Sequence, residues 1–386
     1  MKKYKKLTIY SLLLILMAGA IFYGYNHIEK MKGNTYTLYI GGYGQKGYKY
    51  TFSTKTMEYS KQGEFSVVNP SFLTLSPDGS LLYSVSENAK KSKVVTFDNS
   101  PNFPLLSEAQ GVGAGPCYIL YYKGYLFTAN YDDGSVTMFK TDTNGIISRT
   151  VQKLKFLTSS NDKSIHRIHT VRALKGKFSQ NDYIIATDTG ADMIYLYKMQ
   201  RDTLVNSDLE NEKEVDYKLY KCTPSSLSLA KKSGPRHIEF SRDGKFLFLI
   251  CEKSGDIIVY RLGERDGNLD FKQIGIVNGD IYKGLASADI HLSPDGEYLY
   301  TSHRKSKDGI SIFKVDNGSL NLIAYQATPS YPRSFSITPD GEYMFVACQK
   351  DMSVQLYKVN KRTGHLMNTQ KALTFTDLEP SIVLIK

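Results

Sequence analysis

The sequence predicts an all-β fold, a seven-bladed β-propeller closed by pairing of the N- and C-terminal strands. A hairpin unit recurs along the chain, and half of that unit stands at each end of residues 33–386. No stretch shows the long 3.6-residue apolar period of a helix. The composition agrees, because 29 Tyr and 18 Phe together with 30 Gly suit short twisted strands joined by turns.

The recurring unit is clearest in residues 234–260, GPRHIEFSRDGKFLFLICEKSGDIIVY. Apolar alternation over residues 237–241 predicts a first strand, and the Asp-Gly turn at Gly244 supplies the positive φ that a tight hairpin needs. The aromatic and aliphatic run 246–251 predicts a second strand, and residues 256–260 a third. This stretch therefore reads as most of one propeller blade.

The same unit returns when the chain is aligned on the turn glycine. Strong copies surround Gly79, Gly296 and Gly341, and weaker copies surround Gly124 and span residues 168–188. Their separation fits four-stranded blades with insertions in the loops.

The two ends of the folded region complement each other. Residues 380–385, PSIVLI, form the first half of the unit, and residues 36–42, YTLYIGG, form the second half. Pairing them makes a seventh blade and removes the open sheet edges that invite aggregation.

Residues 1–32 differ from the rest of the chain and are expected to be a signal peptide or N-terminal membrane anchor. Four of the first six residues are lysines, and an uncharged run follows from residue 7 to residue 26. Ala18-Gly19-Ala20 resembles a cleavage site, yet the run is close to the ~20 residues that span a bilayer. We therefore expect an exported protein, either periplasmic or membrane-anchored through residues 7–26 and facing outward. Residues 33–386 form the propeller domain.

Charge and cysteine content exclude several classes of partner. Six lysines and one glutamate in residues 1–32 account for five of the formal net charge of +11, which leaves about +6 on the folded part. That charge is dispersed, so no nucleic-acid binding is expected. The four cysteines lack metal or redox spacing and are interpreted as small buried side chains. We therefore expect no metal and no cofactor.

Two positions of each unit face the mouth of the central channel. At the head of the innermost strand the blades supply, in order, Ser71, Cys117, His169, Arg236, Asp289, Arg333 and Ser381. Eight residues after the turn glycine they supply Glu87, Glu252, Arg304 and Gln349, with Asn130 and Asp188 near the same place in the weaker copies. A purely structural repeat would use one residue type, so this variety indicates a site.

The residue types at these positions point to an anionic substrate. Arg236, Arg304 and Arg333 can bind carboxylate or phosphate through two parallel hydrogen bonds and do not deprotonate. His169 and Glu252 can transfer protons or activate water, and an arginine can stabilise an oxyanion. The candidate substrate-binding set is Glu87, Asn130, Asp188, His237, Arg333 and Gln349. The alternative is that Arg236 and Glu252, each eight residues from Gly244, form a cross-strand ion pair with a purely structural role at the rim of the channel.

Several motifs resemble the lactonase family of seven-bladed propellers. They are GPRHIEF, LICEKSGDIIVY, the repeated SPDGxxLY, ANYDDGSV and DTGADMIYLY. The resemblance covers residues 36–386 and implies that His169, Arg236, Glu252 and Arg304 fall on catalytic positions. The His-x-His of bacterial members reads His-Arg-Ile-His at residues 166–169, so His169 is the matched histidine.

The expected function is therefore metal-independent hydrolysis of an anionic sugar lactone, as in 6-phosphogluconolactonases. Arg236 and Arg304 are expected to bind the acidic group and polarise the carbonyl, while Glu252 or His169 activates water. Two alternatives remain open: a non-catalytic propeller that binds a sugar acid or a protein partner, and a lactonizing isomerase.

Overall fold

The computed structural model describes residues 33–156, 165–176, 181–202 and 216–386. The predictions for residues 1–32 lie outside these residues. Within the described ranges, no helix combines the length and apolar character needed to cross a membrane.

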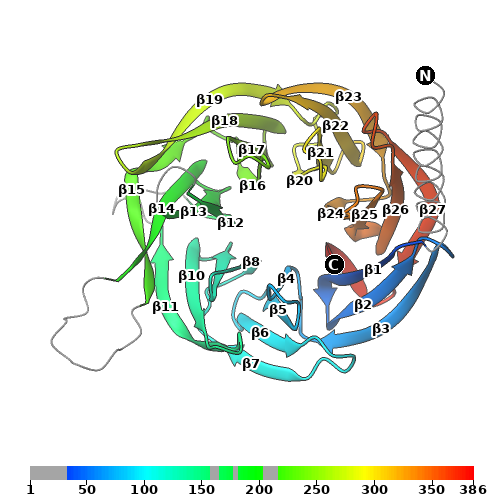
Figure 1. Cartoon of the computed structure of the whole chain (residues 1–386), viewed down its shortest axis with the longest axis horizontal. Helices are drawn as coiled ribbons and strands as arrows, with labels where there is room; N and C mark the ends of the chain where they lie inside the picture. The colour runs from blue at the N-terminus through cyan, green and yellow to red at the C-terminus, as the bar shows by residue number, and fades with distance from the viewer. Residues whose placement is uncertain (1–32, 157–164, 177–180, 203–215) are drawn as a thin grey trace, which may run out of the picture.

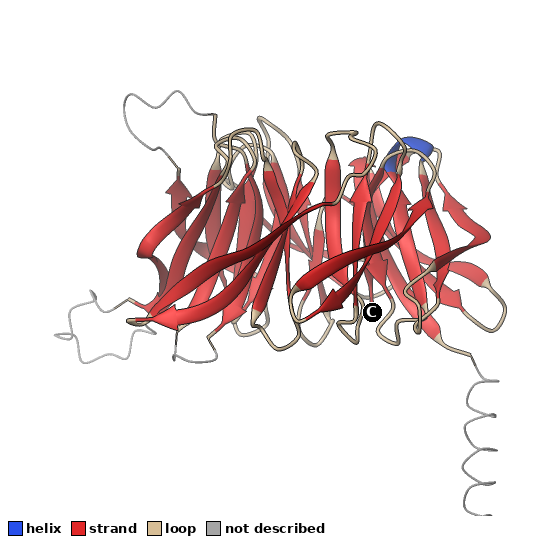
Figure 2. Cartoon of the chain, turned by 90° about the horizontal axis from the view of Figure 1, so that it is seen from above, coloured by secondary structure: helices blue, strands red, loops and turns tan. Residues whose placement is uncertain are grey.

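Seven four-stranded antiparallel sheets surround a central channel, which confirms the predicted propeller (Figure 1). Their strands run between the two faces of a disc (Figure 2). The helical element of the described residues is one 3₁₀ turn, Gln349–Asp351, on one face of the disc.

Within each blade the strands are ordered from the channel outward. The first three blades are β4 (Leu73–Leu75), β5 (Leu81–Ser86), β6 (Lys93–Asp98) and β7 (Leu105–Ala109); β8 (Pro116–Tyr122), β9 (Tyr125–Asn130), β10 (Ser135–Thr141) and β11 (Ile147–Lys155); and β12 (Ile168–Lys175), β13 (Asp182–Asp188), β14 (Met193–Arg201) and β15 (Tyr217–Ser228).

The next three blades follow the same order. They are β16 (Pro235–Phe240), β17 (Phe246–Cys251), β18 (Asp256–Arg265) and β19 (Asn268–Asn278); β20 (Ser287–Leu292), β21 (Tyr298–His303), β22 (Gly309–Asp316) and β23 (Ser319–Ala327); and β24 (Pro332–Ile337), β25 (Tyr343–Cys348), β26 (Ser353–Val359) and β27 (Leu366–Thr374). The predicted strand over residues 246–251 matches β17, and Gly244 has a φ of +66° as its turn requires.

The seventh blade joins the two ends of the chain, as predicted. It consists of β28 (Leu378–Ile385), β1 (Thr35–Gly44), β2 (Lys46–Ser53) and β3 (Glu58–Ser66). Thr37 and Lys386 exchange two backbone hydrogen bonds of 2.9 Å. At Gly42 an added Cβ would lie 2.0 Å from the Glu379 carbonyl oxygen, so glycine allows the close approach of the closing strand.

The core lies between adjacent blades, because the second strand of a blade is buried on both faces. All six residues of β17 are buried, and so are all six of β25. Leu247 and Leu249 of β17 pack with Tyr183 and Ile185 of the preceding blade. Each such side chain contributes roughly 1.5–3 kcal/mol by burial, so the blades stabilise one another around the ring.

A β-bulge near the head of the innermost strand recurs in six blades, and in the closing blade it skips Ser381 between Pro380 and Ile382. In the other five blades the register shifts between Pro116 and Tyr118, Ile168 and Thr170, Pro235 and His237, Ser287 and Ile290, and Pro332 and Ser334. The residues skipped by these shifts include Cys117, His169, Arg236, Asp289 and Arg333. A bulge re-aims its extra residue, so it controls where these side chains point.

Candidate active site

A cavity of about 190 Å³ lies at the end of the channel where the bulges stand. Six of the seven blades contribute to its lining, which consists of Glu87, Cys117, Tyr131, His169, Arg236, Glu252, Arg304 and Arg333. The four residues predicted to be catalytic therefore line one cavity, together with Glu87 and Arg333.

Glu252 lies between two buried arginines. Its Oε2 is 3.2 Å from Arg236 Nε, and its Oε1 accepts a hydrogen bond of 2.9 Å from Arg304 Nη2. Arg236 and Arg304 are only 2% and 3% exposed, whereas the Glu252 side chain is 26% exposed. Burial alone would raise the pKa of Glu252, but the two arginines lower it below its usual value. The carboxylate therefore stays ionised.

Backbone carbonyls at residues 286–288 fix the two guanidinium groups. Arg304 donates from Nε to Ala286 O at 2.7 Å and from Nη2 to Ser287 O at 3.3 Å, and Arg236 Nη1 donates to Ala288 O. Burial and the neighbouring arginines lower the pKa of Arg236 to about 10, although Glu252 opposes this. Arg236 remains charged near neutral pH, and its position is set by the next blade.

Arg333 and Glu87 are joined by a tyrosine that sequence reasoning missed. Arg333 Nη2 donates to Tyr43 OH at 2.8 Å, and this hydroxyl donates to Glu87 at 3.1 Å. Burial raises the pKa of Tyr43, so the hydroxyl keeps its proton. Tyr43 follows Gly42 of β1, which pairs with Pro380 as Cys251 pairs with Pro235, so Tyr43 stands at the blade position of Glu252. The two strands of this hairpin come from opposite ends of the chain, so no turn glycine marks the position in the sequence.

His169 is a neutral base inside the cavity. It is 5% exposed, and burial together with Arg236, His237 and Arg333 holds its pKa well below its usual value. Among the described residues, its Nδ1 makes no hydrogen bond. Tyr131, also missed by the sequence patterns, packs edge-on against the imidazole with ring centroids 5.7 Å apart.

Asn130 and Asp188 lie outside the cavity, and their side chains make structural hydrogen bonds. Both are fully buried. Asn130 Nδ2 donates to Val112 O at 3.0 Å, and Asp188 accepts from the backbone amides of Arg167, Gly190 and Ala191. They do not reach the cavity because each stands one residue before the position of Glu252: Asn130 pairs with Pro116 and Asp188 with Ile168, as Cys251 pairs with Pro235.

His237 and Gln349 also lie outside the arginine cavity. His237 lines a second cavity of about 380 Å³ further along the channel, and its Nδ1 is 2.7 Å from Asp289 Oδ1. Its ring still contacts that of His169, at 5.1 Å between centroids. Gln349 donates to Glu379 at 2.8 Å. Of these two residues, only His237 is next to the catalytic candidates.

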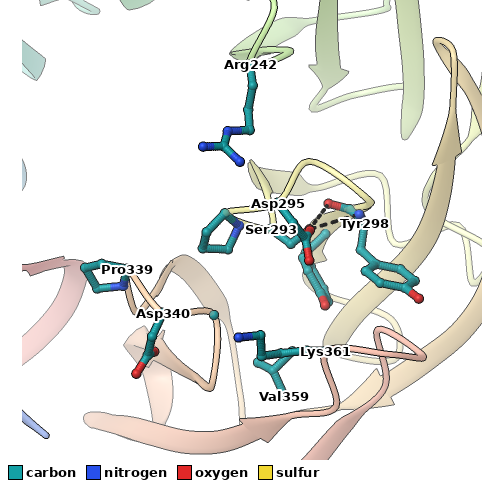
Figure 3. Close-up of a pocket in the computed structure, with 11 residues that line it drawn as sticks. Arg242, Ser293, Asp295, Tyr298, Pro339, Asp340, Val359 and Lys361 are labelled. Atoms are coloured by element: carbon teal, nitrogen blue, oxygen red, sulfur yellow. Dashed lines mark hydrogen bonds between the residues drawn. The ribbon is translucent and has the colours of Figure 1, made fainter. Parts of the chain in front are cut away.

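A third pocket, of about 290 Å³, is lined by residues of the turn between β20 and β21 (Figure 3). Arg304 follows β21 and so stands at the other end of this hairpin. Arg242 and Lys361 reach toward the pocket from different sides. Its carboxylates stabilise the turns to which they belong, since Asp340 accepts a hydrogen bond from the Thr338 hydroxyl and Asp295 accepts one from the Ser293 hydroxyl. Its cations are exposed and its anions are already satisfied, so the smaller arginine cavity is the stronger candidate for chemistry.

The fold and the cavity define a seven-bladed propeller with a buried, arginine-lined cavity in its channel. The family model described as "Lactonase, 7-bladed beta-propeller" matches residues 37–384, and the chain belongs to this family.

Individual relatives agree with the family. A 6-phosphogluconolactonase of Formosa agariphila is 32% identical over 341 residues, covering 84% of this chain and 91% of the relative. One from Bacillus subtilis is 24% identical over 347 residues, covering 86% and 93%. A crystal structure of a candidate 6-phosphogluconolactonase from Bacteroides fragilis has a TM-score of 0.79 and 34% identity, covering 91% of this chain and 98% of that one.

Proposed function

We propose that the protein hydrolyses the internal ester of an anionic sugar lactone. The observation that carries this proposal is the arrangement of Arg236, Glu252 and Arg304 beside neutral His169 in one small cavity. The relatives named 6-phosphogluconolactonase support the same reaction class.

The arginines supply binding and electrostatic stabilisation. A guanidinium that points into a buried cavity binds a carboxylate or phosphate strongly and can also stabilise the oxyanion that forms when water attacks the lactone carbonyl. Because Arg236 and Arg304 are held by backbone carbonyls and Glu252, they need little reorganisation during the reaction. We assign substrate anchoring to Arg333 and carbonyl polarisation to Arg236 and Arg304.

His169 and Glu252 are the two candidates for the base that activates water. Glu252 is ionised and more exposed, but each of its carboxylate oxygens is paired with an arginine, which makes it a weaker base. His169 is neutral and so has a free lone pair. The base takes a proton from the attacking water and returns it to the ring oxygen as the ester C–O bond breaks, which yields the open hydroxy acid.

A panel of lactones tests the reaction. Phosphorylated and plain sugar lactones, including 6-phosphogluconolactone and gluconolactone, are incubated with the purified full chain and with Arg304→Ala. We expect faster hydrolysis of the phosphorylated lactone by the wild type and a loss of at least about 10²-fold in the variant. Wild-type rates equal to spontaneous hydrolysis on every lactone would favour a binding module instead.

We further propose that residues 1–32 are a signal peptide or membrane anchor and that residues 33–386 act outside the cytoplasm. The basic N-terminus and the uncharged run 7–26 support this. Cell fractionation and N-terminal sequencing of the mature protein test it. A protein in the cytoplasmic fraction with an intact N-terminus would contradict export, and sequencing that begins near Ile21 would indicate cleavage.

A further inference from the structure

Four blades share a left-handed residue two positions before the channel-facing residue of the innermost strand. The four are Asn69, Gly115, Gly234 and Tyr331, with φ of +50°, +61°, +64° and +68°. Each precedes a proline. Each also accepts a backbone hydrogen bond at its carbonyl from the residue after the second strand, at 3.0, 2.8, 2.7 and 2.9 Å. The four positions are therefore structurally equivalent.

Tyr331 is the one bulky residue among these four left-handed positions. Glycine and asparagine tolerate a left-handed backbone, whereas a bulky side chain is strained there. The conformation of Tyr331 is nevertheless held on both sides: its amide donates to Asp308 Oδ2 at 2.6 Å, and its carbonyl accepts from the Gln349 amide. Strain that the surroundings enforce is a marker of functional positions.

The ring of Tyr331 covers one face of the Arg304 guanidinium. Arg304 Cζ lies 4.9 Å from the ring centroid. The Nε and Nη2 groups of Arg304 are hydrogen-bonded to Ala286, Ser287 and Glu252. Within the described residues, Nη1 makes no such bond to the protein. The tyrosine therefore confines the guanidinium to one plane and leaves this nitrogen for a ligand.

We infer that Tyr331 is a positioning residue that holds Arg304 in the plane required for anion or oxyanion binding. This inference rests on the proposed function of the cavity. In the equivalent blades Asn69, Gly115 and Gly234 avoid the strain, and none of them has a ring that could cover a guanidinium. In this blade the strain is retained because the ring must stand at that point over Arg304.

Three variants of the full chain separate the strain from the stacking. Tyr331→Ala and Tyr331→Gly both remove the ring, but only glycine relieves the left-handed strain. Tyr331→Phe keeps the ring. We expect the glycine variant to melt at a higher temperature than the alanine variant, although both lose about tenfold in kcat/KM on the accepted lactone. The phenylalanine variant is expected to stay within about twofold of the wild type.

A double-mutant cycle assigns the effect to Arg304. Adding Tyr331→Gly to Arg304→Ala is expected to cause no further loss, because the ring then has no guanidinium to hold. Additive losses would overturn the inference, as would full activity of the glycine variant or a melting temperature of the alanine variant above that of the glycine variant.

Binding of 6-phosphogluconate, measured by calorimetry, distinguishes failure of this inference from failure of the proposed reaction. If the wild type hydrolyses no lactone, the proposed reaction is wrong, and the inference is then judged on binding alone. Weaker binding by Tyr331→Gly than by Tyr331→Phe supports it. Equal affinities, or no binding by either variant, overturn it.

Discussion

Replacing Glu252 with glutamine removes one negative charge from between Arg236 and Arg304 while keeping the shape of the side chain. Both arginines are almost fully buried and lie 3.2 and 2.9 Å from the carboxylate. Removing one partner of a buried ion pair costs about 3–5 kcal/mol. Because the Glu252 side chain is 26% exposed and its charge is partly screened by solvent, we expect a smaller loss of stability than this, about 2–3 kcal/mol.

The effect of Glu252→Gln on catalysis depends on which group is the base. If Glu252 activates water, kcat falls by about 10²-fold or more. KM for an anionic lactone does not rise, since the cavity becomes more positive. Steady-state kinetics on 6-phosphogluconolactone measure both quantities. A kcat within about threefold of the wild type would refute Glu252 as base and leave His169 as the candidate.

The matched comparison is Glu87→Gln, which also removes a carboxylate from the cavity. Glu87 contacts Tyr43 at 3.1 Å rather than either of the two arginines that hold Glu252. We expect this variant to change KM more than kcat, because Tyr43 and Arg333 lose an anchor. Equal kcat losses in both variants would show that the general charge of the cavity, and not a specific base, is responsible.

The pH dependence of stability gives an independent check on Glu252. Its pKa in the folded protein is lowered by the arginines, so its contribution is present above its ordinary value of 4.5 and is lost as pH falls through the folded pKa. The wild type should therefore lose more stability than Glu252→Gln when pH falls below 4.5. Parallel unfolding curves of the two proteins between pH 6 and the acid transition, measured by circular dichroism, would contradict the ion-pair assignment.

Three further predictions concern other parts of the molecule. Removing residues 380–386 should unfold or aggregate the protein, because it strips most of β28 from β1; an unchanged melting temperature would refute the closure. Burial raises the pKa of the Cys117 thiol, so iodoacetamide at pH 8 should not inactivate the native protein, and rapid inactivation with labelling at Cys117 would contradict this. Activity should survive dialysis against EDTA, since three arginines in the cavity repel a metal cation; loss of activity restored by calcium would show the reverse.

Much of the site could be predicted from local patterns. The turn at Gly244 places Arg236 and Glu252 at the same end of one hairpin, and the structure has them in contact. Counting from the turn glycines also brings Arg304, Glu87 and Arg333 to the same cavity. These residues could be identified from the sequence because hairpin register depends on short-range geometry that repeats from blade to blade.

Other members of the site could not be found in this way. Tyr43 comes from the closing blade, and its contacts with Glu87 and Arg333 join residues 44 and 290 positions apart. Asn130 and Asp188 lie one residue before the position of Glu252, because they pair with Pro116 and Ile168 as Cys251 pairs with Pro235. Tyr331 has a left-handed backbone where the equivalent blade has Gly234, and the residue type of tyrosine gives no sign of this conformation in the sequence.

The sequence by itself determined the number of blades, the closure of the ring and the arginines that gather at the channel, since each follows from a repeated strand-turn pattern and from residue type. The tertiary structure decided which side chains enter the cavity and which groups tune them. The physical reason is that bulges re-aim individual residues and that other blades supply charges no local pattern contains: Arg236 and Arg333 beside His169, and Arg304 beside Glu252.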